Sequence, residues 1–386
     1  MTTGSAVSGR PAPDPATSGL EGIVSARTPL SEVDGLKGIL TIRGYDIEEI
    51  ASQISLEEAA YLLWHGKLPN TSELEEQNRR LVSYRSLPDE ARMAVQAAAK
   101  KMEPMDALRF AVASLTVDDP APGDISHEVN QKRAEMIVAR VPIIVGMYQR
   151  LRSGGQVVEP RDDLGIAANL LYQMTGEKPS DAQVRGLETY LVTVTDHGMN
   201  ASTFTTRVIA STASDMVSAV VGGIGALKGP LHGGAPGLVL EMLDAVGAPE
   251  RAAAWLEAEL GSGRRIMGMG HRIYRVRDPH AAVLEKAVET LEREAAPSSR
   301  LRLARAVEKT AEELLSKRHP ERALRANVEF YTAVLLEAVG LPREAFTATF
   351  AVGRVAGWSA HVAEHRRVGK LIRPSSRYVG PRPDHS

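Results

Sequence analysis

The chain of 386 residues contains no cysteine, and aromatic residues make up only 4% of it. The absence of cysteine excludes thiol nucleophiles, disulfides and thiolate metal sites. Aromatic side chains are too few to suggest stacking platforms for single-stranded nucleic acid. Neither sign of charge prevails, since 46 Lys and Arg stand against 48 Asp and Glu, which argues against broad electrostatic capture of nucleic acid. Any chemistry therefore relies on His, carboxylates, hydroxyls and Arg.

The sequence also lacks a long apolar segment. The longest apolar run, residues 216–227, contains three glycines and one serine and is much shorter than the roughly 20 residues of a membrane-spanning helix. Residues 1–20 are rich in Ser, Thr, Pro and Gly and lack the apolar stretch of a secretory signal, so we interpret them as a disordered leader. We expect a cytoplasmic protein that binds neither membrane nor nucleic acid.

Helical patterns dominate the chain after residue 45, and residues 35–44 are the exception because their spacing fits a small β-hairpin better. Ser55 and Glu58 form a capping-box signature that predicts a helix start, and Ser180 with Gln183 repeats it. Further helices are predicted at residues 200–212, 237–245, 281–294, 301–317, 328–339 and 343–364. The length, about two to three times that of a usual domain, predicts more than one folded part, and the fold class is mainly α.

Polar residues of catalytic types collect at four breaks between the predicted helices: residues 196–200 (DHGMN), 228–236 (KGPLHGGAP), 264–272 (RRIMGMGHR) and 327–330 (NVEF). Taken singly, His197 is a helix C-cap and Glu329 a favourable charge at a helix start. His232 lies between Gly and Pro residues, where an ordinary turn is an equally good interpretation. Two imidazoles, His232 and His271, together with one carboxylate would supply a base and donors for a developing oxyanion. The pattern suggests a proton-abstracting enzyme.

Two rival chemistries lack their motifs. The tail residues His361 and His365 are spaced as i and i+4, but the Glu of a zinc-binding helix is missing between them. No Gly-x-Ser-x-Gly elbow follows a strand, which argues against a serine hydrolase. We predict neither a metal site nor a serine nucleophile.

In these motifs the chain resembles the citrate synthases, in particular the short bacterial type. The resemblance covers roughly residues 20–380 and is carried, in order, by residues 38–46 (GILTIRGYD), 196–203 (DHGMNAST), 229–235 (GPLHGGA), 268–274 (GMGHRIY), 327–330 (NVEF) and 373–380 (RPSSRYVG). It implies a two-domain helical fold with a small N-terminal β-hairpin, assembled as a homodimer. The implied large domain comprises residues 21–233 and 341–386, and the small helical domain residues 234–340.

The resemblance also implies an acyltransferase of the Si type that condenses acetyl-CoA with oxaloacetate and water to give citrate and CoA. The CoA thioester would be a co-substrate, with no permanently bound cofactor and no metal. The implied catalytic residues are the base Glu329, the thioester-oxygen donor His232, and His271, which acts on the oxygen that becomes the hydroxyl of citrate. The implied oxaloacetate ligands are His197, His280, Arg354 and Arg373, with Arg373 reaching the partner's site. The implied CoA-binding turn consists of Ile266, Met267, Gly268, Met269 and Gly270.

Two positions depart from the usual family pattern. The usual base is Asp, and Glu329 matches a bacterial branch that has Glu there. His280 stands where the family usually has Arg, which exchanges a permanently charged, bidentate guanidinium for an imidazole.

Two alternatives to citrate synthesis stay open. One is 2-methylcitrate synthesis from propionyl-CoA, because the one methylene by which the two thioesters differ changes the binding free energy by only about 1–3 kcal/mol. The other is a non-catalytic paralogue that binds CoA or oxaloacetate.

Overall fold

The computed structural model describes residues 19–20, 22–233, 236–270, 278–294, 299–320 and 324–381. Apart from Gly19 and Leu20, the expected leader at residues 1–20 lies outside these ranges. Among the described helices, none combines the length and apolar character that crossing a membrane requires.

A small antiparallel sheet lies near the N-terminus, with strands β1 (Ser31–Asp34), β2 (Ile39–Ile42) and β3 (Tyr45–Asp46) in that order. The expected hairpin at residues 35–44 is confirmed, but its first strand begins earlier and residues 35–38 form the turn. Leu36, an apolar residue within the expected hairpin, lies in this turn and is 77% exposed. Leu40 and Ile42 are buried and alternate with half-buried neighbours, which anchors the sheet on the helices.

The helices before residue 230 are α1 (Ile47–Ile50), α2 (Leu56–His65), α3 (Thr71–Ser83), α4 (Asp89–Ala99), α5 (Pro104–Ser114), the 3₁₀ turn η2 (Leu115–Asp118), α6 (His127–Arg152), α7 (Ile166–Thr175), α8 (Asp181–Thr193), α9 (Ala201–Ser211) and α10 (Met216–Leu227). The capping box of Ser55 and Glu58 opens α2, and that of Ser180 and Gln183 opens α8, as predicted. Gly66 ends α2 with a φ of 79°, a left-handed conformation that glycine adopts without strain.

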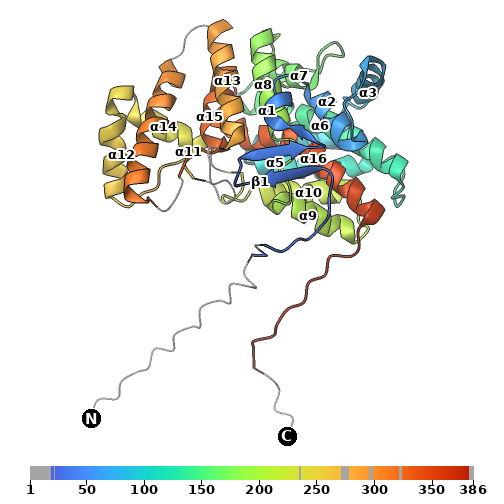
Figure 1. Ribbon diagram of the computed structural model, residues 1–386. Coiled ribbons are helices and arrows are strands. Elements are labelled where there is room, and N and C mark those ends of the chain that lie inside the picture. The colour runs from blue at the N-terminus through green and yellow to red at the C-terminus, as the bar shows by residue number, and fades with distance from the viewer. Residues whose placement is uncertain are drawn as a thin grey trace, which may run out of the picture.

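The later helices are α11 (Pro236–Val246), the 3₁₀ turn η3 (Pro249–Arg251), α12 (Ala252–Gly261), α13 (Pro279–Glu294), α14 (Ser299–Arg318), α15 (Val328–Val339), the 3₁₀ turn η4 (Arg343–Ala345) and α16 (Phe346–Val368). The predicted helices are confirmed, with ends displaced by a few residues. Helices α11 to α15 stand together on one side of the molecule, and the remaining helices with the sheet form the other side (Figure 1).

Helix α16 runs through the interior and packs against α2, α6, α8, α9 and α10. Two of its glycines allow a very close approach to neighbouring backbone. A Cβ at Gly353 would lie 2.6 Å from the carbonyl oxygen of Leu191, and one at Gly357 would lie 2.1 Å from that of Thr195. Because no larger side chain fits there, α16 lies directly against the end of α8 and the loop that follows it.

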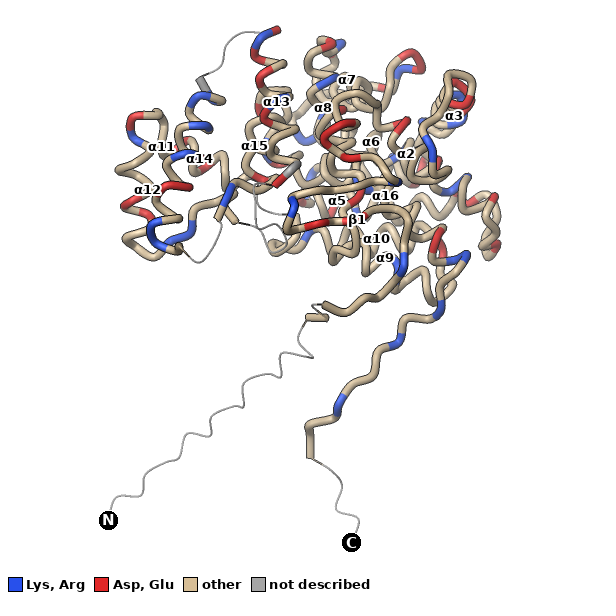
Figure 2. Tube along the Cα trace, in the orientation of Figure 1, with Lys and Arg blue, Asp and Glu red and all other residues tan. Residues whose placement is uncertain are grey.

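The segment after α16, residues 369–381, extends away from the body (Figure 1). It is exposed along almost its whole length, including Leu371 at 59%, Tyr378 at 66% and Val379 at 90%. Basic residues are spaced along it (Figure 2). The segment is held to the body near its start, where the Ile372 amide donates to Ser211 Oγ at 3.1 Å, but its apolar side chains stay exposed.

Candidate functional site

A cavity of about 440 Å³ opens where the two groups of helices meet. Its lining comprises Thr193, Val194, His197, Asn200, Ala201, Pro230, Leu231, His232, Gly270, His280, Asn327, Val328, Glu329, Phe350 and Arg354. The structure thus brings together five of the residues predicted to be catalytic or to bind substrate, from five separate segments: His197, His232, His280, Glu329 and Arg354. His271, the remaining predicted catalytic residue, lies outside the described residues.

His197 lies on the loop between α8 and α9, four residues beyond the end of α8, whereas the sequence placed it at the helix end. Asn200 holds this loop: its side-chain oxygen accepts a hydrogen bond from the Thr203 amide at 3.0 Å and caps α9. Gly198 has a φ of 57°, which turns the chain sharply after His197. The ring of His197 lies 5.2 Å from that of His280, between ring centroids. The loop therefore presents His197 beside His280 at the cavity wall.

Arg354 of α16 places a buried cation in the cavity wall. Its side chain is 3% exposed, and its Nε donates to the carbonyl oxygen of Val194 at 2.6 Å. The guanidinium carbon lies 4.7 Å from the ring centroid of Phe350, within cation–π range. Burial lowers the pKa of Arg354 to about 10, so it keeps its positive charge at neutral pH. A buried cation of this kind favours an anionic ligand.

His232 follows the turn that ends α10 and faces the same cavity. Its Nε2 lies 2.8 Å from Ser202 Oγ, which also accepts a hydrogen bond from Trp358 Nε1 at 3.1 Å. Burial and the charge of Arg354 lower the pKa of His232 to about 4. The imidazole is therefore neutral at pH 7. When Ser202 donates to Nε2, the ring carries its proton on Nδ1.

Glu329 lies in the first turn of α15, after the N-cap Asn327, whose side-chain oxygen accepts from the Glu329 amide at 3.0 Å. Burial, and then the nearby charge of Asp278, raise the pKa of Glu329 to about 8. A carboxyl group with such a pKa can accept a proton from a weak carbon acid and return it near neutral pH.

Asp278 connects His280 with the helix that carries Glu329. One carboxylate oxygen accepts from His280 Nδ1 at 2.6 Å and from the His280 amide at 3.0 Å. The other accepts from the Val328 amide at 3.0 Å. His280 is only 3% exposed. Asp278 thereby fixes the orientation of His280 relative to the start of α15.

The turn at residues 266–270 lies against the segment that leads into α15. The Gly270 amide donates to the carbonyl oxygen of Arg325 at 2.7 Å, and Asn327 Nδ2 donates to that of Gly270 at 2.8 Å. Ile266 and Met269 also line a second cavity of about 340 Å³. Its basic lining residues are Arg264, Arg265, Arg318 and His319. The turn thus separates the main cavity from a basic one.

Arg373 is the predicted substrate ligand that the structure does not bring to this cavity. It is exposed on the extended segment after α16 and contributes nothing to the cavity lining of its own chain. Within the described ranges, no group of three or more His, Cys, Asp or Glu side chains is arranged to hold a metal ion.

Comparison with known proteins identifies the family. The family model described as "Citrate synthase, C-terminal domain" matches residues 19–375. The chain belongs to the citrate synthase family. It is 38% identical to "Citrate synthase 2" of Bacillus subtilis over 95% of this chain and 96% of the relative. It is 36% identical to "2-methylcitrate synthase 2" of Corynebacterium glutamicum over 94% of each chain.

A solved citrate synthase shares the fold. The ternary complex of carboxymethyl coenzyme A and oxaloacetate with citrate synthase from Thermoplasma acidophilum superposes with a TM-score of 0.87 at 28% identity, covering 95% of this chain and 97% of that one. The mainly helical fold inferred from the sequence is therefore that of the citrate synthase family.

Several residues around the site of this citrate synthase family member were not identified from the sequence. Asp278 was not singled out, although an Asp two residues before a His is suitably spaced to hold its ring. Ser202 and Phe350 lie within helices and gave no signal. His361 was weighed only as a metal ligand, paired with His365, and Glu364 was not singled out. Their position on an apolar helix was the available clue, because buried polar groups require partners.

The raised pKa of Glu329 predicts a pH-dependent gain in stability when Gln replaces it. In the native state the pKa is about 8, against a usual value of 4.5. Below about pH 4.5 both native and unfolded states hold the proton. Between about pH 4.5 and 8 only the unfolded chain releases it, so the free energy of unfolding falls as the pH rises. Glu329→Gln should therefore raise the melting temperature more at pH 8 than at pH 5, as measured by calorimetry.

Glu337 at the other end of α15 supplies the control. Burial would raise its pKa, but hydrogen bonds from Arg300 and Arg343 lower it overall. Glu337→Gln should therefore lower the melting temperature at pH 8, whereas Glu329→Gln should raise it. An equal effect of Glu329→Gln at pH 5 and pH 8 would contradict the raised pKa.

Proposed function

We propose that this chain condenses acetyl-CoA with oxaloacetate and water to give citrate and CoA. The observation that supports this most is the single cavity that holds Glu329, with a pKa of about 8, the neutral His232 and the buried cation Arg354. A carbon–carbon bond formed through an enol requires a base, a neutral hydrogen-bond donor and a clamp for an anionic electrophile.

The first step is removal of a methyl proton from the thioester. Glu329 takes this proton, and its raised pKa brings its basicity closer to that of a weak carbon acid. His232 donates a hydrogen bond to the thioester oxygen as negative charge develops there. Because its pKa of about 4 keeps the ring neutral, it stabilises the enol without competing with the base for a proton.

The second step is attack of the enol carbon on the keto carbon of oxaloacetate. Arg354 pairs with a carboxylate of the substrate, and His197 and His280 contact the same substrate. His271, by resemblance, protonates the oxygen that becomes the hydroxyl of citrate. Hydrolysis of the citryl thioester then releases CoA.

The turn at residues 266–270 is proposed to bind CoA, with no metal and no resident cofactor in the reaction. The left-handed Gly268, with a φ of 72°, packs so tightly that a Cβ would lie 2.9 Å from the Phe330 ring. This contact fixes the turn relative to α15. The neighbouring basic cavity, with Arg264, Arg265 and Arg318, suits a phosphate-bearing ligand.

The protein is proposed to assemble as a homodimer. It is proposed to be located in the cytoplasm and to function in the tricarboxylic acid cycle. Each chain would comprise a large domain (residues 21–233 and 341–386) and a small one (234–340), and the cavity lies between helices of the two. The exposed segment with Arg373 is proposed to reach the site of the partner subunit, which supports the inference that the dimer is the catalytic unit.

A second candidate is 2-methylcitrate synthesis, favoured by the similarity to the enzyme of that name from Corynebacterium glutamicum. Thiol release from acetyl-CoA and from propionyl-CoA, each with oxaloacetate, tests both functions. We expect a higher kcat/KM for acetyl-CoA. A preference for propionyl-CoA would assign the chain to the second function, and no release from either thioester would favour the non-catalytic paralogue.

A further inference from the structure

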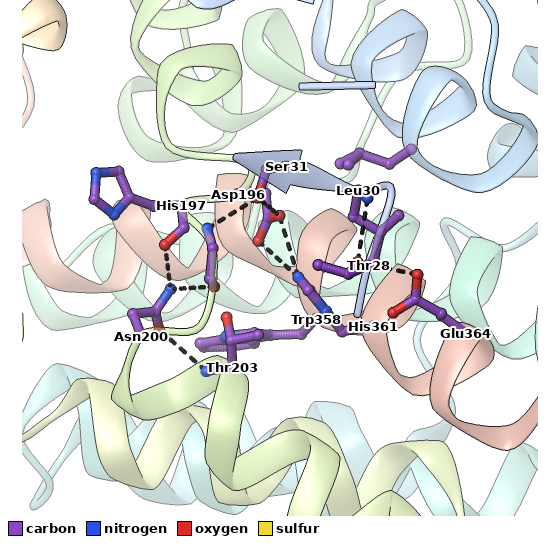
Figure 3. A network of polar contacts seen from close by, with 12 residues as sticks. Thr28, Leu30, Ser31, Asp196, His197, Asn200, Thr203, Trp358, His361 and Glu364 are labelled. Atoms are coloured by element: carbon purple, nitrogen blue, oxygen red, sulfur yellow. Dashed lines mark hydrogen bonds and ion pairs between the residues drawn. The ribbon is translucent and has the colours of Figure 1, made fainter. Parts of the chain in front are cut away.

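A network of polar contacts lies beside the loop that carries His197, among residues that do not line the cavity (Figure 3). Asp196 is fully buried, and its carboxylate accepts a hydrogen bond from Ser31 Oγ at 2.6 Å. His361 Nε2 of α16 lies 3.1 Å from the same carboxylate. The Gly198 amide donates to Ser31 Oγ at 2.9 Å. Contacts on both sides of His197 thus converge on Asp196 and Ser31.

The other nitrogen of His361 faces a second buried charge. Its Nδ1 lies 2.9 Å from Arg207 Nη1, which also donates to Glu364 Oε2 at 2.6 Å. Both Arg207 and His361 are almost completely buried. Glu364 in turn accepts a hydrogen bond from Thr28 Oγ1 at 3.0 Å, so this network of polar contacts extends to the segment before β1 (Figure 3).

The hydrogen-bond donors in this network of polar contacts determine the tautomer of His361. A guanidinium only donates, so His361 Nδ1 accepts from Arg207. The ring proton must then lie on Nε2, from which it is donated to Asp196. The order of donation is therefore Arg207 to His361 to Asp196.

Helix α16 also limits where the loop can lie. Gly357, one turn before His361, leaves no room for a Cβ between itself and the carbonyl oxygen of Thr195. His361 thus holds the Asp196 side chain while Gly357 contacts the backbone just before it. Burial alone would raise the pKa of Asp196, but His361, then Arg354 and Ser31, lower it to about 2. Asp196 is consequently an anion that must keep its donors.

We propose that His361 is a positioning residue for substrate binding: as an Nε2–H donor held by Arg207, it fixes Asp196 and thereby the position of His197 in the cavity wall. This inference rests on the proposed function in that the substrate placed by His197 is oxaloacetate. His361 itself does not line the cavity. Its loss should affect the affinity for the keto dicarboxylate far more than that for the thioester.

The test compares the kinetics of four variants. His361→Leu removes the donor, His361→Gln keeps an N–H at a similar reach, and Ser31→Ala removes the second contact to Asp196 from a less buried position. His365→Leu is the matched control, because His365 lies one turn further along α16, is also buried, and has its side-chain hydrogen bond with the Lys370 carbonyl and not with Asp196. We expect the KM for oxaloacetate to rise about tenfold in His361→Leu and about threefold in Ser31→Ala, as for one lost hydrogen bond to a charged group.

In the same variants the KM for acetyl-CoA should change less than about twofold, and His361→Gln should recover most of the loss. Should His361→Leu fail to fold, the KM for oxaloacetate in Ser31→Ala and in His361→Gln still tests the proposal. An unchanged KM for oxaloacetate in Ser31→Ala, or an equal rise in His365→Leu, would overturn the proposal.

A second readout does not depend on turnover. Nitrogen NMR of histidine-labelled protein, with His361 assigned by its loss in His361→Gln, should show the Nε2–H tautomer. An Nδ1–H tautomer would contradict the proposed order of donation. If the wild type releases no thiol, the proposed function fails, and calorimetric titration of oxaloacetate into the wild type and Ser31→Ala still tests the positioning role.

Discussion

Glu329→Gln should reduce thiol release from acetyl-CoA by about 10²–10⁴-fold, the contribution of a positioned general base. The amide has nearly the shape of the carboxyl group but cannot accept the methyl proton. Oxaloacetate binding should persist, because Arg354 and the histidines of the cavity are unchanged. Exchange of the acetyl methyl protons with solvent measures the affected step directly, and wild-type exchange in this variant would show that Glu329 is not the base.

Glu329→Asp is the matched control, since it keeps a carboxylate and introduces the base that the resemblance gives as the usual one. It should retain part of the activity that Gln loses. In the wild type, only about a tenth of Glu329 is ionised at pH 7 if its pKa is about 8. The kcat/KM for acetyl-CoA should therefore rise with pH and level off above about pH 8. A profile that is flat from pH 6.5 to 9 would be at odds with a base of this pKa.

Arg373→Ala and His232→Ala chains, each inactive alone, should restore activity when they are mixed and allowed to exchange subunits. Arg373 lies on the exposed segment after α16 and is absent from the cavity of its own chain. If it completes the partner's site, one site of each hybrid dimer receives both defects and the other receives neither. With random exchange of equal amounts, about a quarter of the wild-type activity should return.

Subunit exchange must be verified independently, for example by mass spectrometry of differently labelled chains. The control pairs His232→Ala with Glu329→Gln. Both residues belong to the cavity of one chain, so no hybrid site is complete. Verified exchange without recovery in the first mixture would refute the shared site.

The sequence predicted the helices well wherever caps and apolar spacing agreed, as at Ser55 and Ser180. The hairpin was shifted because glycines mark turns as readily as strand ends, and Leu36 proved to be a turn residue. Short strands are specified mainly by the surface onto which they pack, which local spacing does not show.

The site was predicted in a different way. His232 and Glu329 were singled out by their place at helix breaks, but only the resemblance joined them to Arg354, which lies within a long helix. Asp278 and Arg207 went unidentified because their roles depend on contacts between segments distant in sequence. Burial and partner identity arise from tertiary packing, so no local pattern reveals them.

Helix α16 carries Arg354, Gly357, His361 and Glu364 at intervals of three, four and three residues, which places them on one face. The helix therefore fixes the distances between the cation that is proposed to bind substrate (Arg354), the close backbone contact (Gly357) and the hydrogen-bond donor to Asp196 (His361). Inserting a single residue between Arg354 and Gly357 would rotate the later positions by about 100° relative to the first. No single side-chain replacement could restore their alignment, whereas an insertion after Val368 would leave it intact. Insertions and deletions within this stretch are therefore far less tolerable than substitutions.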